Sequence, residues 1–341
     1  MTTVRPAVAR GSLAAALVTA LLGCAHAPMA PASTTADAPE EEIIEYHVKT
    51  FMPDPSVAEY RVPLFMLRGH PAVIAHLPGS SEPLYFVVDT AAGLSVIDPE
   101  VAKRFKLETV ADEVRGISGA GGNASNVGMV LAKNLTIGKL DVTADMLSMD
   151  MGFGSDDDGL GRTPIAGIIG LNVLRAFHVT FDLSRGELLL RSNADPEEHC
   201  TASLGLDGKK SSYITGDLTL PGGGKVRAVI DTGAAQTIFN WHAAKAIGVQ
   251  PGDARLRKRV KGSRGIDKNA MDTWLFDLPG LQWNDWDMSA REIRISDLPV
   301  FEKLGLANRP AVIFGIDFLR DRRFTIAKDS AGFCLRSEQD K

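Results

Sequence analysis

The chain has 341 residues, of which 45% are hydrophobic and 23% are charged. This balance is typical of a globular protein and excludes a disordered or fibrous one. Its 37 Lys and Arg residues are outnumbered by 42 Asp and Glu residues, which gives a formal net charge of -5. A chain without a basic excess is poorly suited to hold nucleic-acid phosphates, so we expect no nucleic-acid partner. The length allows about two domains.

The first residues have the pattern of a targeting segment. Arg5 and Arg10 precede an apolar run over residues 12–23, which is too short to span a bilayer as a helix. The run ends in Leu21-Leu22-Gly23-Cys24, which resembles the processing site of bacterial lipoproteins. We therefore expect a signal peptide over residues 1–23 and lipidation of Cys24, which would anchor the protein on the periplasmic side of the bacterial cell envelope. Ordinary secretion, with cleavage near residues 25–27, is the alternative.

Residues 24–42 contain few large apolar side chains, so they are expected to form a flexible tether behind the lipidated cysteine. Beyond the tether the chain has only two cysteines, Cys200 and Cys334. In an envelope compartment such a pair suggests one disulfide, and two unrelated buried thiols are the alternative. No Cys/His cluster with the spacing of metal ligands is present, so no metal site is predicted.

The body of the chain contains one pattern twice. LYFVVDTAAGLSVIDPEVAKRFKLE, which begins at Leu84, aligns without gaps with VRAVIDTGAAQTIFNWHAAKAIGVQ, which begins at Val226, at an offset of 142 residues. Further along, AGIIGLNVLR from Ala166 matches AVIFGIDFLR from Ala311 at an offset of 145. We therefore expect two homologous lobes, at residues 43–200 and 201–341.

Each copy has the same order of expected elements. Strand-like runs joined by turns rich in Pro and Gly lead to an Asp-Thr pair, and a short helix follows near residues 99–105 or 241–247. Strands and long helices do not alternate, which argues against a doubly wound parallel sheet. The sequence therefore predicts a mainly β fold.

Two acidic residues occupy matching positions in the copies. An apolar strand leads into Asp89-Thr90-Ala91 in the first copy and into Asp231-Thr232-Gly233 in the second. A carboxylate directly after such a strand is costly to bury unless it is paired or used. Each turn is followed about eighty residues later by two apolar residues and a glycine, at 168–170 and 313–315. A single Asp-Thr-Gly tripeptide occurs by chance in many proteins, whereas its occurrence twice at equivalent positions is a specific signal.

This arrangement resembles the aspartic peptidases, and more narrowly the bacterial members whose retropepsin-like lobes are fused in one chain. The resemblance covers about residues 60–337. It implies two β-barrel lobes related by a pseudo-twofold axis, with the active site between them. It also implies that Asp89 and Asp231 form the catalytic pair, while Thr90 and Thr232 brace the turns across the axis.

The implied activity is hydrolysis of peptide bonds by a water molecule that the two aspartates activate. Carboxylates about 3 Å apart cannot both ionise, so they share a proton and titrate as a coupled pair. This chemistry requires no cofactor and no metal. The expected partner is a peptide or protein substrate, and the expected state is a monomer with both aspartates in one chain, touching the membrane only through its lipid.

A substrate-binding flap is expected between the first Asp-Thr turn and the first glycine triplet. RGISGAGGNASN, which begins at Arg115, contains several glycines and so has the backbone freedom of a mobile lid. Its candidate substrate contacts are Gly116, Ile117, Ser118 and Gly119, and Arg264 is the candidate from the second lobe. Ordinary glycine-rich turns are the alternative.

The first turn departs from the family pattern because Ala91 stands where a glycine is usual. In the family this glycine lets the main chain turn and approach the substrate closely, so the methyl group of Ala91 could narrow the cleft or displace Asp89. Three hypotheses follow: an active endopeptidase, a catalytically degenerate peptide-binding lipoprotein, and a structural lipoprotein. The third predicts no peptide-sized cleft between the lobes, and a separation of more than about 6 Å between the two carboxylates would favour it.

Overall fold

The computed structural model describes residues 51–120, 122–151, 165–194, 202–204 (backbone only), 213–260, 263, 271–283, 286–320, 322–328 and 332–335. Most of the regular structure in these ranges is strand. The helical elements are short: α1 (Pro99–Arg104), α2 (Leu171–Leu174), α3 (Trp241–Ala246), α4 (Pro299–Lys303) and the 3-10 turn η2 (Ile316–Phe318). No helix in the described part of the chain is long and apolar enough to cross a bilayer. The prediction of a mainly β fold is confirmed.

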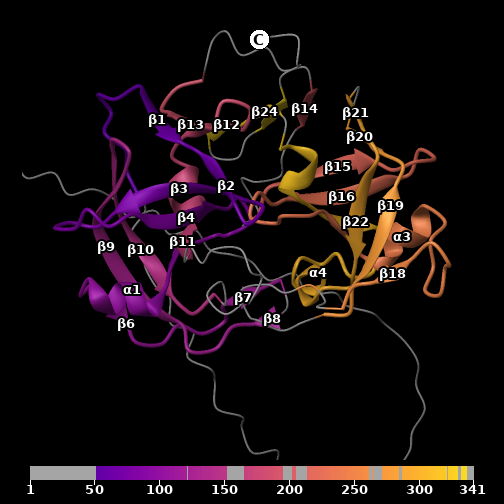
Figure 1. Ribbon diagram of the computed structural model, residues 1–341, viewed down its shortest axis with the longest axis horizontal. Coiled ribbons are helices and arrows are strands. Elements are labelled where there is room, and N and C mark those ends of the chain that lie inside the picture. The colour runs from indigo at the N-terminus through magenta and orange to yellow at the C-terminus, as the bar shows by residue number, and fades with distance from the viewer. Residues whose placement is uncertain are drawn as a thin grey trace, which may run out of the picture. The chain divides into compact units, whose positions relative to one another are not determined.

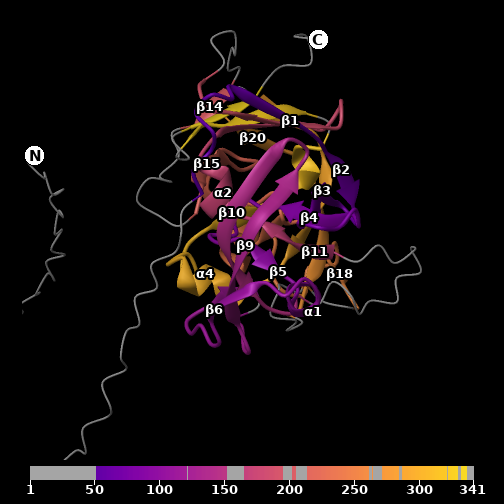
Figure 2. The same cartoon turned by 90° about the vertical axis from the view of Figure 1, so that its left-hand side faces the viewer.

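The first half of the chain forms a sheet in the order β2-β3-β4-β11-β5-β10-β9-β6. Figure 2 shows its long β9–β10 hairpin facing the viewer. The strands are β2 (Phe65–Leu67), β3 (His70–His76), β4 (Leu84–Val88), β5 (Val96–Ile97), β6 (Glu108–Ala111), β9 (Gly128–Ile137), β10 (Leu140–Ser148) and β11 (Ile165–Ile169).

The second half forms a sheet in the order β18-β19-β22-β17-β23-β16-β15-β20-β21. Its strands are β15 (Thr215–Thr219), β16 (Lys225–Ile230), β17 (Ile238–Phe239), β18 (Arg257–Lys258), β19 (Trp274–Leu278), β20 (Leu281–Trp283), β21 (Trp286–Met288), β22 (Arg291–Ile295) and β23 (Ala311–Phe314).

The two sheets have corresponding centres. In the first, β11 pairs parallel with β4 and antiparallel with β5, which in turn pairs parallel with β10. In the second, β23 pairs parallel with β16 and antiparallel with β17, which pairs parallel with β22. The helices that follow also correspond, because Asp98 caps the N-terminus of α1 and Asn240 caps that of α3. The repeated sequence has therefore produced a repeated lobe.

A third sheet joins the two lobes, in the order β1-β13-β12-β24-β25-β14. Its strands are β1 (Glu59–Pro63), β12 (His178–Asp182), β13 (Glu187–Arg191), β14 (Ala202–Leu204), β24 (Arg323–Ile326) and β25 (Phe333–Leu335). Strands β12 and β24, which lie far apart in the sequence, run side by side in it (Figure 1).

The contact between β12 and β24 marks the pseudo-twofold axis. Thr180 lies opposite Thr325 in the register, and their hydroxyl oxygens are 2.7 Å apart. These residues are 145 positions apart, which is the offset of the second repeated segment, so each one meets its own counterpart. Beside them the rings of Phe181 and Phe324 stack with centroids 4.7 Å apart. The lobes thus share a buried interface and are not joined merely by a linker.

Several expectations fall outside the described residues: the signal peptide (1–23), the tether (24–42) with Cys24, and the residues Cys200 and Arg264. Cys334, in β25, is disulfide-bonded. Strand β14 begins two residues after Cys200 and pairs with β25, with Ser203 opposite Cys334 in the register. A bond between Cys200 and Cys334 remains a prediction.

Candidate active site

Asp89 and Asp231 each stand directly after the end of a buried central strand, β4 or β16. The backbone N–H of Asp89 donates to the carbonyl of Ile169 at 3.0 Å, and that of Asp231 donates to the carbonyl of Phe314 at 3.0 Å. The accepting carbonyls belong to the two glycine triplets identified in the sequence. Each triplet therefore holds its own Asp turn, which explains why the motifs occur together.

The glycines of the triplets are required by close packing. A Cβ atom on Gly170 would lie 2.7 Å from the carbonyl oxygen of Ala92, and one on Gly315 would lie 2.7 Å from that of Ala234. These same carbonyls accept hydrogen bonds from the N–H groups that follow the triplets, at 2.8 and 2.9 Å. No side chain larger than hydrogen fits between the triplet and the turn.

Thr90 and Thr232 connect the two turns to each other. The N–H of Thr90 donates to the hydroxyl of Thr232 at 3.1 Å, and the N–H of Thr232 donates to the hydroxyl of Thr90 at 3.1 Å. Each hydroxyl then donates across the axis, to Ile230 or Val88, at 2.8 Å. Both threonines are fully buried, so these four bonds are shielded from water. The threonines lie where the resemblance implied that braces should be.

Behind each turn lies a further brace that the sequence analysis missed. Ser95 donates from its N–H and its hydroxyl to one oxygen of Asn172, at 2.8 and 2.7 Å. In the second lobe Thr237 donates from the same two groups to the carboxylate of Asp317, at 3.0 and 2.7 Å. The repeat alignment pairs Ser95 with Thr237 and Asn172 with Asp317, and this was the signal available in the sequence.

The carboxyl groups of Asp89 and Asp231 interact directly, and each affects the pKa of the other. Oδ1 of Asp89 also accepts from the N–H groups of Ala91 and Ala92, at 2.7 and 3.1 Å. Oδ1 of Asp231 accepts from the N–H of Ala234 at 2.9 Å. Carboxyl groups that interact directly lack the wide separation that would have favoured a structural lipoprotein.

Burial raises the pKa of both aspartates. For Asp89 the loss of hydration outweighs the backbone N–H groups of Ala91 and Ala92, which favour the charged form. For Asp231 the loss of hydration and the neighbouring negative charge of Asp89 together raise the pKa well above the ordinary value. The pair therefore retains a proton at a pH where isolated aspartates would be ionised. Both side chains keep some exposure to solvent, so a reactant can reach them.

Gly233 and Ala91 occupy equivalent positions in the two turns. A Cβ atom on Gly233 would lie 2.4 Å from both Cγ and Oδ2 of Asp89, so only glycine fits there. Neither residue has a positive φ. The turn therefore does not need a positive φ at this position, and the constraint on Gly233 is the space beside the opposite carboxyl. By the same symmetry, Ala91 is expected beside Asp231.

The candidate flap forms a small hairpin, in which β7 (Ser118–Gly119) pairs with β8 (Gly122–Asn123). Gly116, at its base, has φ +76°, a conformation that favours glycine, and the carbonyl of Ile117 accepts from Ala124 at 2.9 Å. The predicted residues Gly116, Ile117, Ser118 and Gly119 thus do form a hairpin.

The hairpin of the first lobe contacts helix α4 of the second. The N–H of Val300 donates to the carbonyl of Ala120 at 3.3 Å, and the Lys303 ammonium donates to the side chain of Asn123. Ala120 packs against a buried apolar cluster that includes Leu298 and Phe301, and this cluster also contacts Ala234, three residues after Asp231. The hairpin therefore reaches the second lobe near its Asp turn.

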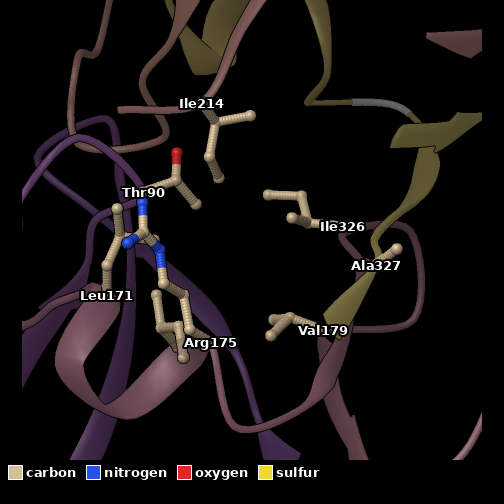
Figure 3. Close-up of a pocket in the computed structure, with 8 residues that line it drawn as sticks. Thr90, Leu171, Arg175, Val179, Ile214, Ile326 and Ala327 are labelled. Atoms are coloured by element: carbon tan, nitrogen blue, oxygen red, sulfur yellow. The ribbon is translucent and has the colours of Figure 1, made fainter. Parts of the chain in front are cut away.

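A small cavity of about 10 Å³ lies behind the Thr90 turn. Figure 3 shows it between Thr90 and the strands of the sheet that joins the lobes, here represented by Val179 and Ile326. It has room for about one water molecule, so it cannot hold a substrate. Among the described residues, no group of three or more His, Cys, Asp or Glu side chains is placed to hold a metal ion.

His70, at the start of β3, is a polar residue near the site to which the sequence analysis gave no role. Its Nδ1 lies 2.7 Å from the carbonyl oxygen of Gly233, although the two residues are 163 positions apart. A contact of this kind between lobes leaves no periodic or local signal in a sequence.

Comparison with known proteins supports the same region. Residues 74–173 match a family model described as aspartyl protease. The matched segment contains the Asp89 turn, the candidate flap and the first glycine triplet, while the second Asp turn lies beyond it. No curated protein matches the chain.

Proposed function

We propose that the protein is an aspartic endopeptidase that hydrolyses peptide bonds with one aspartate from each lobe. The observation that carries this proposal is the pairing of the Asp89 and Asp231 turns, which reciprocal threonine hydrogen bonds join and which place the carboxyl of Asp89 against Gly233 of the other turn. The match of residues 74–173 to the aspartyl protease family supports it.

The two carboxyl groups would have different catalytic roles, depending on which of them is protonated. The pair shares one proton, which we assign to Asp231; Asp89 is then ionised and its Oδ1 accepts from the backbone N–H groups of Ala91 and Ala92. Asp89 takes a proton from water, and the hydroxide attacks the carbonyl carbon as Asp231 gives its proton to the carbonyl oxygen. Asp89 then passes its proton to the leaving amine as the C–N bond breaks, and a hydroxyl group of the intermediate returns its proton to Asp231 as the C=O of the product acid forms. No covalent intermediate forms with the protein.

The test is cleavage of a denatured protein and of a peptide library, from about pH 4 to about pH 8, around the expected titration of the pair. Asp231→Asn should abolish cleavage, because an amide cannot deliver the acidic proton. Asp217→Asn is the control, since this exposed aspartate in β15 pairs with Arg227 on the surface. Undiminished cleavage by Asp231→Asn would rule out the proposal.

Ala91 favours one alternative, a catalytically degenerate lipoprotein that binds peptides without cutting them. A methyl group beside Asp231 would occupy space that the equivalent Gly233 leaves to Asp89. On this alternative the wild type binds peptides throughout the pH range and never cleaves them, and Ala91→Gly restores cleavage. Cleavage by the wild type eliminates it.

We also propose that the enzyme acts at the periplasmic side of the bacterial envelope, as a lipoprotein anchored at Cys24. The basis is the sequence alone: two arginines, a short apolar run and the Leu21–Cys24 motif. A lipid anchor would raise the local concentration of substrates at the same membrane. Cys24→Ala should move the protein from the membrane fraction to the soluble fraction, and an unchanged distribution would contradict the anchor.

A further inference from the structure

The Asp231 turn receives a contact from the opposite lobe. His70 begins β3 of the first lobe, and its Nδ1 lies 2.7 Å from the carbonyl oxygen of Gly233. The preceding residue, Gly69, has φ +84°, and a Cβ atom on it would lie 3.2 Å from Cβ of Ala235. The turn between β2 and β3 therefore packs directly on the residues that follow Asp231.

The carbonyl that His70 contacts belongs to a peptide group that serves Asp231. The other end of this group is the N–H of Ala234, which donates to Oδ1 of Asp231 at 2.9 Å. A trans peptide group is planar, with its C=O and N–H pointing in opposite directions. Holding the Gly233 oxygen therefore also fixes the direction of the Ala234 N–H.

The chemistry of the contact determines which tautomer His70 adopts. A carbonyl oxygen can only accept, so Nδ1 of His70 carries the proton and donates it. A hydrogen bond to the C=O of a peptide group polarises that group and makes its N–H a stronger donor. The stronger donor in turn favours the ionised form of the carboxyl that accepts from it.

We propose that His70 is a positioning residue, which holds the Gly233–Ala234 peptide and so makes Asp231 a stronger acid. His70 does not touch the reacting atoms in this role. The inference deepens the proposed function, since it matters for catalysis only if Asp231 is one of the catalytic pair.

The charges around His70 favour its neutral form. Burial lowers the pKa of His70, and the cations Arg294 of β22 and Arg68 of the adjoining turn lower it further. The guanidinium of Arg294 is itself oriented by Gln236, to which its Nε donates at 2.8 Å. The nearby acidic group is Asp231, which is linked to His70 through the Gly233–Ala234 peptide group. His70 therefore acts as a constant neutral donor while the aspartates titrate.

The test is a titration of the aspartate carboxyls by carbon-13 NMR in the full folded chain, with signals assigned through Asp89→Asn and Asp231→Asn. His70→Leu removes the donor, and His70→Gln moves it to the position of the other ring nitrogen. Both should make Asp231 a weaker acid by about threefold to tenfold, the range for one hydrogen bond. His70→Asn keeps a donor near Nδ1 and should titrate close to the wild type. His76→Leu, at the far end of β3, is the control and should change nothing.

Peptide cleavage gives a second readout. In His70→Leu we expect kcat to fall with KM little changed, and His70→Asn to recover most of the rate. The alkaline limb of the pH profile, which reports loss of the proton on Asp231, should move to higher pH. A shifted titration in a protein that never cleaves peptides would uphold the role of His70 while the proposed function fails.

An unchanged carboxyl titration in His70→Leu would overturn the inference, and so would a lower KM with an unchanged titration, because His70 would then compete with substrate for the Gly233 carbonyl. If His70→Leu does not fold, His70→Gln decides by the same criterion.

Discussion

The turns at Asp89 and Asp231 have nearly the same hydrogen bonds but different surroundings. Each is bound to its glycine triplet and to the opposite threonine at matching distances. Beside Asp89 lies Gly233, which leaves no room for a methyl group, whereas the equivalent position in the first turn is Ala91. His70 of the first lobe contacts the carbonyl of Gly233, in the second turn. A symmetric frame of hydrogen bonds thus holds two carboxyls whose neighbouring residues differ.

The braces behind the turns differ in the same way. The first lobe uses the neutral amide of Asn172, and the second uses the buried carboxylate of Asp317. Burial raises the pKa of Asp317 despite the hydrogen bonds from Thr237. The difference shows that the brace needs an acceptor for two donors, and that a charge is not essential to it.

The largest effect is expected from exchanging the residues beside the carboxyls. In Gly233→Ala the new methyl group would overlap the carboxyl of Asp89, which must move. Because a displacement of about 1 Å can cost about a hundredfold in rate, we expect kcat to fall by at least that factor. Steady-state cleavage of a peptide measures it. Gly224→Ala is the control, since a Cβ atom there meets nothing within 4 Å.

The reciprocal change, Ala91→Gly, should have a much smaller effect. It removes a methyl group that the turn already accommodates and costs roughly 0.5–1 kcal/mol of stability through the added backbone freedom. Equal losses from Gly233→Ala and Ala91→Gly would show that the two positions are not distinguished as the structure indicates.

Breaking the threonine contacts should affect both lobes equally. Thr90→Val or Thr232→Val preserves the shape but leaves a buried N–H and a buried carbonyl without their partners. We expect each to lower the free energy of unfolding by about 2–4 kcal/mol, as measured by denaturant titration. The two changes remove different hydrogen bonds, but the turns contact each other, so the loss in the double variant should differ from the sum of the single losses. Unequal single losses would contradict the symmetry of the frame.

Substitutions in the two braces should change the pH dependence of Tm in opposite directions. A buried carboxyl with a raised pKa contributes stability that is present at low pH and lost as the pH rises through that pKa. Asp317→Asn should therefore gain in Tm relative to the wild type as the pH rises, by a few degrees at most. Asn172→Asp should instead lose Tm relative to the wild type as the pH rises. Scanning calorimetry across acidic to neutral pH checks both, and parallel curves for the wild type and Asp317→Asn would contradict the assignment.

The smallest effect is expected from the contact between the hairpin and α4. Lys303 and Asn123 are exposed, so Lys303→Ala should change the global stability by less than about 1 kcal/mol. Hydrogen exchange of the β7–β8 hairpin should nevertheless become faster. Lys225→Ala is the control, because this exposed lysine also donates to a neutral side chain, Thr219, on another strand. Unaltered exchange in Lys303→Ala would show that the contact does not restrain the hairpin.

Much of this site could be predicted because the sequence repeats. The offset of 142 residues pairs Asp89 with Asp231 and Thr90 with Thr232, and the structure brings both pairs into contact. The glycine triplets were also identifiable, since apolar strands that end in glycine are conspicuous. These features are local motifs that occur twice, so each copy supports the interpretation of the other.

What the sequence analysis missed are contacts that join distant segments without a motif. His70 reaches Gly233 only because the β2–β3 turn of one lobe packs on the other, and the docking of the hairpin on α4 has the same origin. The physical reason why position 233 must be glycine was missed because it also depends on a contact between distant segments. A sequence shows that a position is glycine, but only coordinates show whether φ or a neighbouring atom requires it.

The central claim is that Asp89 and Asp231 form one catalytic unit, and a double-variant comparison tests it most directly. Rates of peptide cleavage would be measured for Asp89→Asn, Asp231→Asn and the variant carrying both changes. If the two act as a unit, each single change already removes the whole contribution, so all three variants should share one background rate. Substantial activity in either single variant, or losses that multiply in the double variant, would contradict the account.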